Sequence, residues 1–210
     1  PDLADAHFGY AHLLIFFNRL DEALFHIDRA RELDPLRPLI NVIHAGMIDM
    51  VGQEEAALQS LQRSFELTPD FWLSLYVRAG IMLDRGVPAA AVADLENAAE
   101  RSGGNNQVLG MLAMAYGAAG NLHAAKEVVS ALNKRASESY VPPSALAAAY
   151  LGIGETDKAL ELLEQAYEQH DVRIAYLGMD ARWNAIRAHP RFRELLNQLG
   201  FSPEPARGRF

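Results

Sequence analysis

The chain has 210 residues, half of them hydrophobic and 22% charged, which is typical of a folded chain with a sizeable core. Its net charge of −8 argues against direct binding of nucleic acid, and the absence of cysteine excludes disulfides, thiolate metal sites and cysteine nucleophiles. No apolar stretch approaches the roughly 20 residues of a membrane helix and the first residues lack a basic signal-peptide start, so we expect a cytoplasmic protein without membrane contact.

A regular repeat runs through the chain. The segment Glu-Leu-Asp-Pro at residues 32–35 returns as Glu-Leu-Thr-Pro at residues 66–69, an offset that matches the period of roughly 34 residues of a helix-turn-helix repeat. In this register a small residue is followed four places later by an apolar one, at Ala23 and Ile27, Ala57 and Leu61, Ala91 and Leu95, Ala125 and Val129, and Ala159 and Leu163. The register predicts five repeats.

Each repeat divides into two helices. Apolar residues recur at three- and four-residue spacing in the first helices, which are predicted near residues 3–17, 37–51, 71–85, 105–119 and 142–152. A glycine, which accepts the left-handed conformation, ends four of these helices at Gly52, Gly86, Gly120 and Gly154, and Asn18 takes that role in the first repeat. Short loops then lead into the second helices.

The residues after the last repeat differ from it in charge. Residues 171–210 hold seven arginines against four acidic residues, and we expect this positive charge to complement the last repeat. A short helix around Trp183, then a helix that starts at Pro190 and turns Phe192 inward, would close the open hydrophobic end of the repeats.

The repeat residues resemble the tetratricopeptide repeat (TPR) family, in which an alanine opens the second helix, a small residue such as Ala30 or Ala98 follows, and a proline closes the unit. The resemblance implies an all-α fold, a right-handed α-α superhelical solenoid of about five TPR helix pairs plus C-terminal capping helices. Ser64 and Gly103 depart from the pattern. The expected boundaries are five repeats over residues 1–170, capping helices over residues 171–200 and a flexible tail over residues 201–210.

A second resemblance involves the stretches 140–147, 180–183 and 190–196. They look like the C-terminal TPR block of bacterial multidomain signalling proteins, where such a block follows a winged-helix DNA-binding domain, a nucleotide cyclase domain or a protein kinase domain. The chain begins without Met and almost at once inside a helical pattern, which suggests a part of a longer polypeptide. The resemblance implies a sensory or scaffolding module, and we favour the C-terminal part of a transcriptional regulator.

In the TPR family the first helices line a concave groove. The positions expected to contact a partner there are Phe8, His12, Phe16, Val42, Met50, Tyr76 and Met114. An apolar groove suits an amphipathic helix or an apolar peptide, and the absence of Lys and Arg from the groove positions argues against the carboxylate clamp of chaperone-binding TPR proteins. About half of the aromatic side chains would instead pack between repeats. Gly110 and Gly117 would either admit a ligand or allow close helix packing.

No pattern of catalytic or cofactor-binding residues is found. Residues 103–106 form a turn without the Lys-Ser/Thr ending of a phosphate loop, and His7 and His12 are five positions apart, on different faces of one helix. We therefore expect no enzyme activity, no cofactor and no metal.

The resulting prediction is a non-catalytic protein–protein interaction and regulatory module whose partner is a protein or a peptide. One alternative is a homo-oligomerisation element that pairs an effector enzyme such as a nucleotide cyclase, and an apolar patch on an end helix would favour a homodimer. The other alternative is a small-molecule sensor domain in which the half of the groove lined by small residues encloses a ligand.

Overall fold

The computed structural model describes residues 2–201. All regular secondary structure in this range is helical, and short turns and loops connect the helices. Ten α-helices form five consecutive pairs: α1 (Ala4–Phe16) with α2 (Leu20–Leu33), α3 (Pro38–Met50) with α4 (Glu54–Leu67), α5 (Trp72–Asp84) with α6 (Pro88–Arg101), α7 (Asn106–Ala118) with α8 (Leu122–Glu138), and α9 (Pro143–Gly152) with α10 (Thr156–Glu168). The predicted all-α repeat architecture is confirmed.

The helix ends follow the period of the repeat. All five second helices begin at the same position of their repeats, at Leu20, Glu54, Pro88, Leu122 and Thr156. Asn18 and the four glycines predicted to end the first helices all have positive φ angles, between 54° and 82°. Only α9 starts late in its repeat, because Pro142 and Pro143 disfavour the helical conformation in the residues before them.

The repeat positions that hold a small residue lie where the two helices of each pair contact one another. The five alanines, Ala23, Ala57, Ala91, Ala125 and Ala159, are completely buried. The apolar residues four places later are also buried, so the two helices of each repeat meet along these positions.

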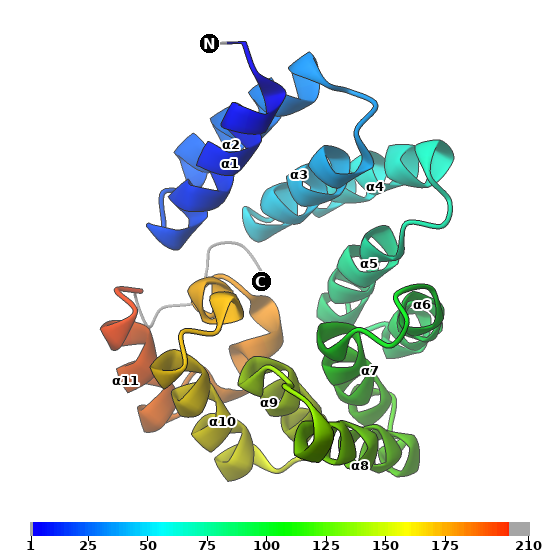
Figure 1. Ribbon diagram of the computed structural model, residues 1–210, viewed down its shortest axis with the longest axis vertical. Helices are drawn as coiled ribbons and strands as arrows, with labels where there is room; N and C mark the ends of the chain where they lie inside the picture. The colour runs from blue at the N-terminus through cyan, green and yellow to red at the C-terminus, as the bar shows by residue number, and fades with distance from the viewer. Residues whose placement is uncertain (1, 202–210) are drawn as a thin grey trace.

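The pairs are arranged as an open ring (Figure 1). The chain after α10 continues through two 3₁₀ helices, η1 (Val172–Tyr176) and η2 (Ala181–Ile186), into α11 (Pro190–Gln198). As expected of a cap, α11 packs on α10. The 3₁₀ helices do more than cap, because η1 also contacts α1 and η2 contacts α5.

The contact between α7 and α9 is unusually close. A methyl group added to Gly110 or Gly117 would overlap the backbone carbonyl group of Ala145 or Gly152 in α9, and one added to Gly152 would lie 2.6 Å from the Cα of Met114. The two glycines of α7 therefore serve helix packing, and the part of the expected groove lined by small residues is filled by α9.

A further expectation concerns the C-terminal end of the chain, where residues 201–210 were predicted to form a flexible tail. Phe201, which was assigned to the flexible tail, is instead buried and lies against Gly178. The rest of the predicted tail, residues 202–210, lies outside the described residues.

No helix between residues 2 and 201 is both long enough and apolar enough to cross a membrane.

Candidate functional site

The first helices and the C-terminal segment enclose a pocket of about 430 Å³. Its walls come from the first helices α1, α3, α5, α7 and α9 on one side and mainly from residues 172–184 on the other. We call residues 171–187 the cap segment. A volume of this size is in the range of sites for small organic ligands.

Five of the seven predicted contact residues line this pocket: His12, Phe16, Val42, Met50 and Tyr76. Phe8 does not line the pocket. Its ring packs edge to face against the His12 ring, and the Arg37 guanidinium group lies 5.9 Å from its centroid. Met114 does not line the pocket either, and its Cα lies at the contact between α7 and α9. The structure thus brings the residues of the first three repeats together, and their part in binding stays a prediction.

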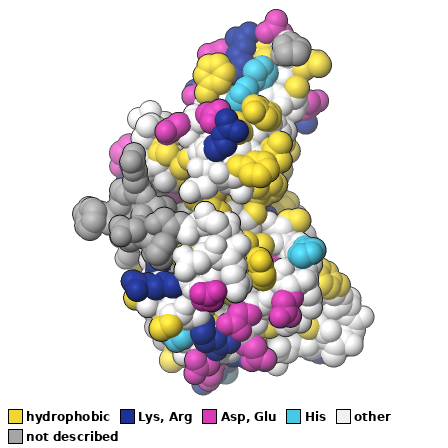
Figure 2. All heavy atoms as spheres, turned by 90° about the vertical axis from the view of Figure 1, so that its left-hand side faces the viewer, with side chains coloured by type: hydrophobic (Ala, Val, Ile, Leu, Met, Phe, Trp, Pro, Cys, Tyr) yellow, Lys and Arg dark blue, Asp and Glu magenta, His cyan; other side chains and the backbone are white. Residues whose placement is uncertain are grey.

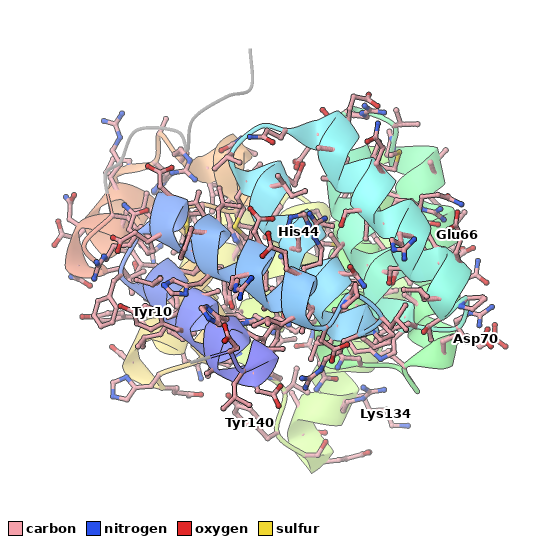
Figure 3. The ribbon with its side chains drawn as sticks, turned by 90° about the horizontal axis from the view of Figure 1, so that it is seen from above. Tyr10, His44, Glu66, Asp70, Lys134 and Tyr140 are labelled. Carbon is pink, nitrogen blue, oxygen red and sulfur yellow. The ribbon has the colours of Figure 1, made fainter. Side chains whose placement is uncertain are left out.

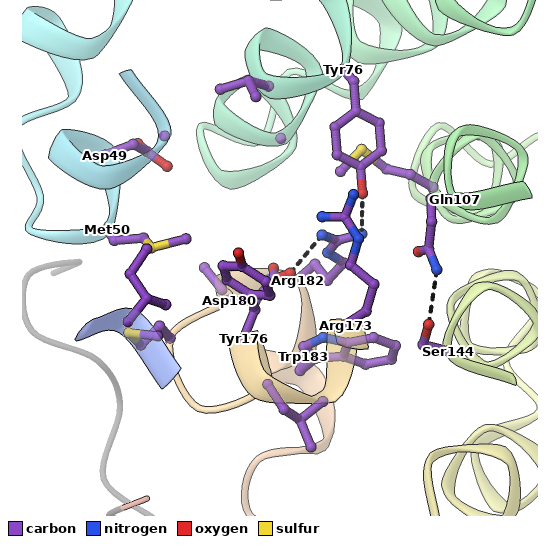
Figure 4. A pocket seen from close by; sticks show the side chains of 18 of the residues that line it. Asp49, Met50, Tyr76, Gln107, Ser144, Arg173, Tyr176, Asp180, Arg182 and Trp183 are labelled. Atoms are coloured by element: carbon purple, nitrogen blue, oxygen red, sulfur yellow. Dashed lines mark hydrogen bonds and ion pairs between the residues drawn. The ribbon is translucent and has the colours of Figure 1, made fainter. Parts of the chain in front are cut away.

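One end of the pocket is polar (Figure 4). The Tyr76 hydroxyl accepts a hydrogen bond of 3.0 Å from Nη1 of Arg182, and Nη2 of Arg182 lies 2.6 Å from the Asp180 carboxylate. Nearby, Nε2 of Gln107 donates to the Ser144 hydroxyl at 2.9 Å. Tyr76 is only 5% exposed, so this candidate contact residue is covered by the cap segment.

Arg182 is a largely buried cation that its neighbours stabilise. Burial by itself lowers the pKa of its guanidinium group, but Asp180 and Tyr76 outweigh burial and raise the pKa. Its Nε is buried and has no hydrogen-bond acceptor among the described residues. Such an unsatisfied donor is uncommon in a protein interior and calls for an explanation.

Arg173 enters the same pocket from η1. Its guanidinium group lies 5.9 Å from the ring centroid of Tyr176, and this group makes no hydrogen bond or ion pair with any described residue. The statement that the groove lacks Lys and Arg therefore holds for the repeats but is wrong for the pocket. The positive charge of the C-terminal segment was visible in the sequence, but no local pattern indicated that two of its arginines line the pocket.

The remaining pocket wall is mainly apolar. Leu73 and Val77 of α5 and the flexible thioether side chains of Met47, Met50 and Met111 contribute to it. The rings of Phe16 and Tyr176 meet edge to face, with centroids 5.8 Å apart, where α1 approaches η1. The pocket is thus polar at the end formed by α5, α7 and α9 and apolar toward α1 and α3.

Arg187 stabilises the fold of the cap segment through hydrogen bonds within it. It is 5% exposed and donates hydrogen bonds to the Gly178 carbonyl oxygen at 2.9 Å and to the Asn184 side chain at 3.1 Å. The positive charge of this region was expected to complement the last repeat, whereas Arg182 and Arg187 are largely buried within the cap segment. Arg191 does meet the last repeat, through a bidentate pair with Glu164.

The outer side of the first helix pair carries a cluster of four rings, of which those of Tyr10 and Phe25 are exposed. The His26 ring contacts the rings of His7, Tyr10 and Phe25, with centroids 4.6 to 5.2 Å apart. Phe25 is 67% exposed, and Tyr10 lies on the outside of the helix pair (Figure 3). Figure 2 shows hydrophobic side chains gathered over the upper part of this face, where the first pair lies. We refer to these four residues as the His26 cluster.

Three histidines have a pKa below the ordinary value, namely His12, His26 and His44, and burial is the main cause in each. The unfolded chain therefore binds protons at these positions at higher pH than the folded chain does. We expect the free energy of unfolding to be constant above about pH 6.5 and to fall below it, by at most about 1.4 kcal/mol per pH unit for each histidine. Urea unfolding between about pH 7.5 and 5.5 measures this, and rising stability on acidification would contradict it.

No cluster of three His, Asp or Glu side chains suited to a metal ion occurs within residues 2–201. The pocket combines hydrogen-bond donors such as Arg173 and Arg182 with the carboxylates of Asp49, Asp84 and Asp180, and a cavity with a few polar groups suits a ligand or a chain segment.

No known family model matches this chain, and no curated protein sequence is similar to it. Among solved structures, the crystal structure of MamA protein is similar, with 17% sequence identity and a TM-score of 0.48 over 82% of this chain and 94% of that chain. The assignment of the fold rests on the helix pairs and their regular period.

Proposed function

We propose that this chain is a non-catalytic interaction module whose concave face recognises a segment of a partner protein, and that its own cap segment occupies part of this face. The observation that carries the proposal is the hydrogen bond between Tyr76 and Arg182, which joins α5 to η2 across 106 residues of sequence. A partner that uses this part of the face has to displace the cap segment or bind beside it.

The cap segment has the properties of a replaceable occupant. Its two 3₁₀ helices have only five and six residues, and such helices depend on packing for their stability. A competing segment that displaces them disrupts few helical hydrogen bonds, but it has to replace the core packing of residues such as Leu177 and Trp183.

As the parent of this module we propose a bacterial transcriptional regulator or another signalling protein with an effector domain before the repeats. The support for this is the resemblance of residues 140–147, 180–183 and 190–196 to the C-terminal TPR block of such proteins. A module with a covered binding face fits a role in regulation, because uncovering the face would be the regulated step.

The partner proposal is tested at the mouth of the pocket. Phe16 lines the pocket and is 43% exposed, whereas its neighbour Phe17 is 66% exposed and lies outside it. We expect a bacterial protein captured by the unaltered chain to be retained by Phe17→Asp and to lose affinity about tenfold or more with Phe16→Asp, because an aromatic contact residue becomes a buried charge. Quantitative mass spectrometry of the captured proteins measures the ratio.

Equal capture by both variants would contradict recognition through the concave face. A chain that captures no protein above the level of an unrelated bait would also contradict it. Circular dichroism checks that both variants keep their helices.

A second candidate function is homo-oligomerisation, as in a module that pairs two copies of an effector enzyme such as a nucleotide cyclase. The specific observation in its favour is the His26 cluster, an exposed aromatic surface on the end helix pair. Light scattering then gives a dimer for the unaltered chain and a monomer for Phe25→Asp, while a monomer for both would remove this candidate.

A further inference from the structure

We propose that the pocket beneath the cap segment binds a small amphiphilic anion, a molecule with one carboxylate group and an apolar body. This inference concerns a small molecule and does not depend on recognition of a protein partner. It rests on the two arginines, the convergent donors at the polar end and the apolar wall.

The charges around the polar end favour an anion. Two guanidinium groups enter the pocket from the cap segment (Figure 4), and only one of them, that of Arg182, is paired with a carboxylate, that of Asp180. The guanidinium group of Arg173 is half-buried and has no acceptor among the described residues. A partly buried cation without an acceptor is compensated best by a ligand carboxylate, which can accept two of its hydrogen bonds.

The acidic residues of the pocket do not occupy this place. Asp180 is engaged with Arg182. Asp49 lies beside Met50, on the opposite side of the pocket from Gln107 and Ser144 (Figure 4). Asp84 also lines the pocket, and both Asp49 and Asp84 already take part in interactions of their own.

Neutral groups at the polar end add donors. The Tyr76 oxygen accepts from Arg182, so its own hydrogen is available to a ligand. The Ser144 oxygen accepts from Gln107, so its hydrogen is available in the same way. Together with Arg173 these hydroxyl groups present donors from three directions, which suits the oxygens of a carboxylate.

The apolar body of the ligand would lie toward α1 and α3. The wall there includes Ile15 and Phe16 of α1 and Met47 and Met50 of α3, and methionine side chains adapt to ligands of different shape. A volume of about 430 Å³ accommodates a single small molecule. An alkyl or aromatic chain of moderate length thus matches the pocket.

The test uses the full chain and decanoate, with 1-decanol as the neutral probe of the same chain length. Isothermal titration calorimetry compares the unaltered chain with Arg173→Gln and with Arg193→Gln, which removes the same charge from an exposed position on α11. We expect saturable binding of decanoate, at least about tenfold weaker with Arg173→Gln and unchanged with Arg193→Gln, because the first variant removes a charged hydrogen bond. We expect 1-decanol to bind more weakly than decanoate, and we expect neither variant to change its affinity.

Absence of saturable decanoate binding would overturn the proposal. Equal binding of decanoate to all three chains, or equal binding of decanoate and decanol, would overturn it as well, because it would show apolar adsorption only. Arg173→Gln should keep the fold, since the guanidinium group makes only an aromatic contact at 5.9 Å. If it does not, Arg173→Lys, which keeps the charge but not the bidentate geometry, should weaken binding by a smaller factor, and unchanged binding would contradict the proposal.

Discussion

Gly117→Ala is expected to lower the melting temperature by roughly 6–12 °C, because each kcal/mol corresponds to about 2–4 °C for a domain of this size. The new Cβ would overlap the carbonyl oxygen of Gly152 and lie 2.7 Å from its carbonyl carbon, so α7 and α9 would have to separate. Backbone atoms cannot move aside as a side chain can, and overpacking of this kind costs about 3 kcal/mol. A single added methyl group therefore has a large effect at this position.

Gly80→Ala is the matched control. Gly80 also lies within a first helix, α5, but a Cβ there would meet only the end of the Met111 side chain, at an ordinary 3.8 Å. Alanine is the better helix former by up to about 1 kcal/mol, so this variant should be neutral or more stable. Thermal unfolding followed by circular dichroism compares the two, and equal melting temperatures would show that α7 and α9 do not approach as closely as described.

Arg182→Met is expected to lower the free energy of unfolding by about 3 kcal/mol, the lower end of the range of about 3–5 kcal/mol for breaking a buried ion pair. The side chains of Arg182 and Asp180 are 15% and 18% exposed, so removal of the cation leaves a largely buried carboxylate without its partner and takes one hydrogen bond from Tyr76. We take the lower end because both groups keep some solvent contact.

Arg191→Met provides the comparison for this pair. Arg191 and Glu164 form a bidentate pair with distances of 2.7 and 2.8 Å, but their side chains are 40% and 42% exposed. Exposed pairs contribute about 0–1 kcal/mol, so this variant should lose little. Urea unfolding measures both, and a loss for Arg182→Met no larger than that for Arg191→Met would contradict the buried link between the cap segment and α5.

The repeat architecture could be predicted because it is encoded locally. Small and apolar residues at fixed spacing define each helix pair, and residues such as Gly86 or Asn18 mark helix ends through their backbone conformation. The constant period of the repeat then places every helix relative to the next.

The candidate site could be predicted only in part. Tyr76 was placed correctly on the concave side, but its bond to Arg182 joins residues 106 positions apart, and no periodic pattern encodes such a contact. Gly117 was ambiguous for a different reason, because the absence of a side chain serves close helix packing and ligand access equally well. Met114 was expected in the groove but does not line the pocket, and its Cα lies at the contact between α7 and α9.

The covered concave face is tested most directly by hydrogen exchange of the backbone amides, read by mass spectrometry on peptides from the cap segment and from α6. The amides of Ile174, Leu177 and Trp183 donate hydrogen bonds within the cap segment, and its docking on α1 and α5 should protect them from exchange. We expect protection of residues 172–187 in the unaltered chain and exchange at least about tenfold faster in Arg182→Met, with α6 unchanged in both. Exchange of residues 172–187 at the rate of an unfolded peptide in the unaltered chain would contradict the account, because the cap segment would then not occupy the concave face.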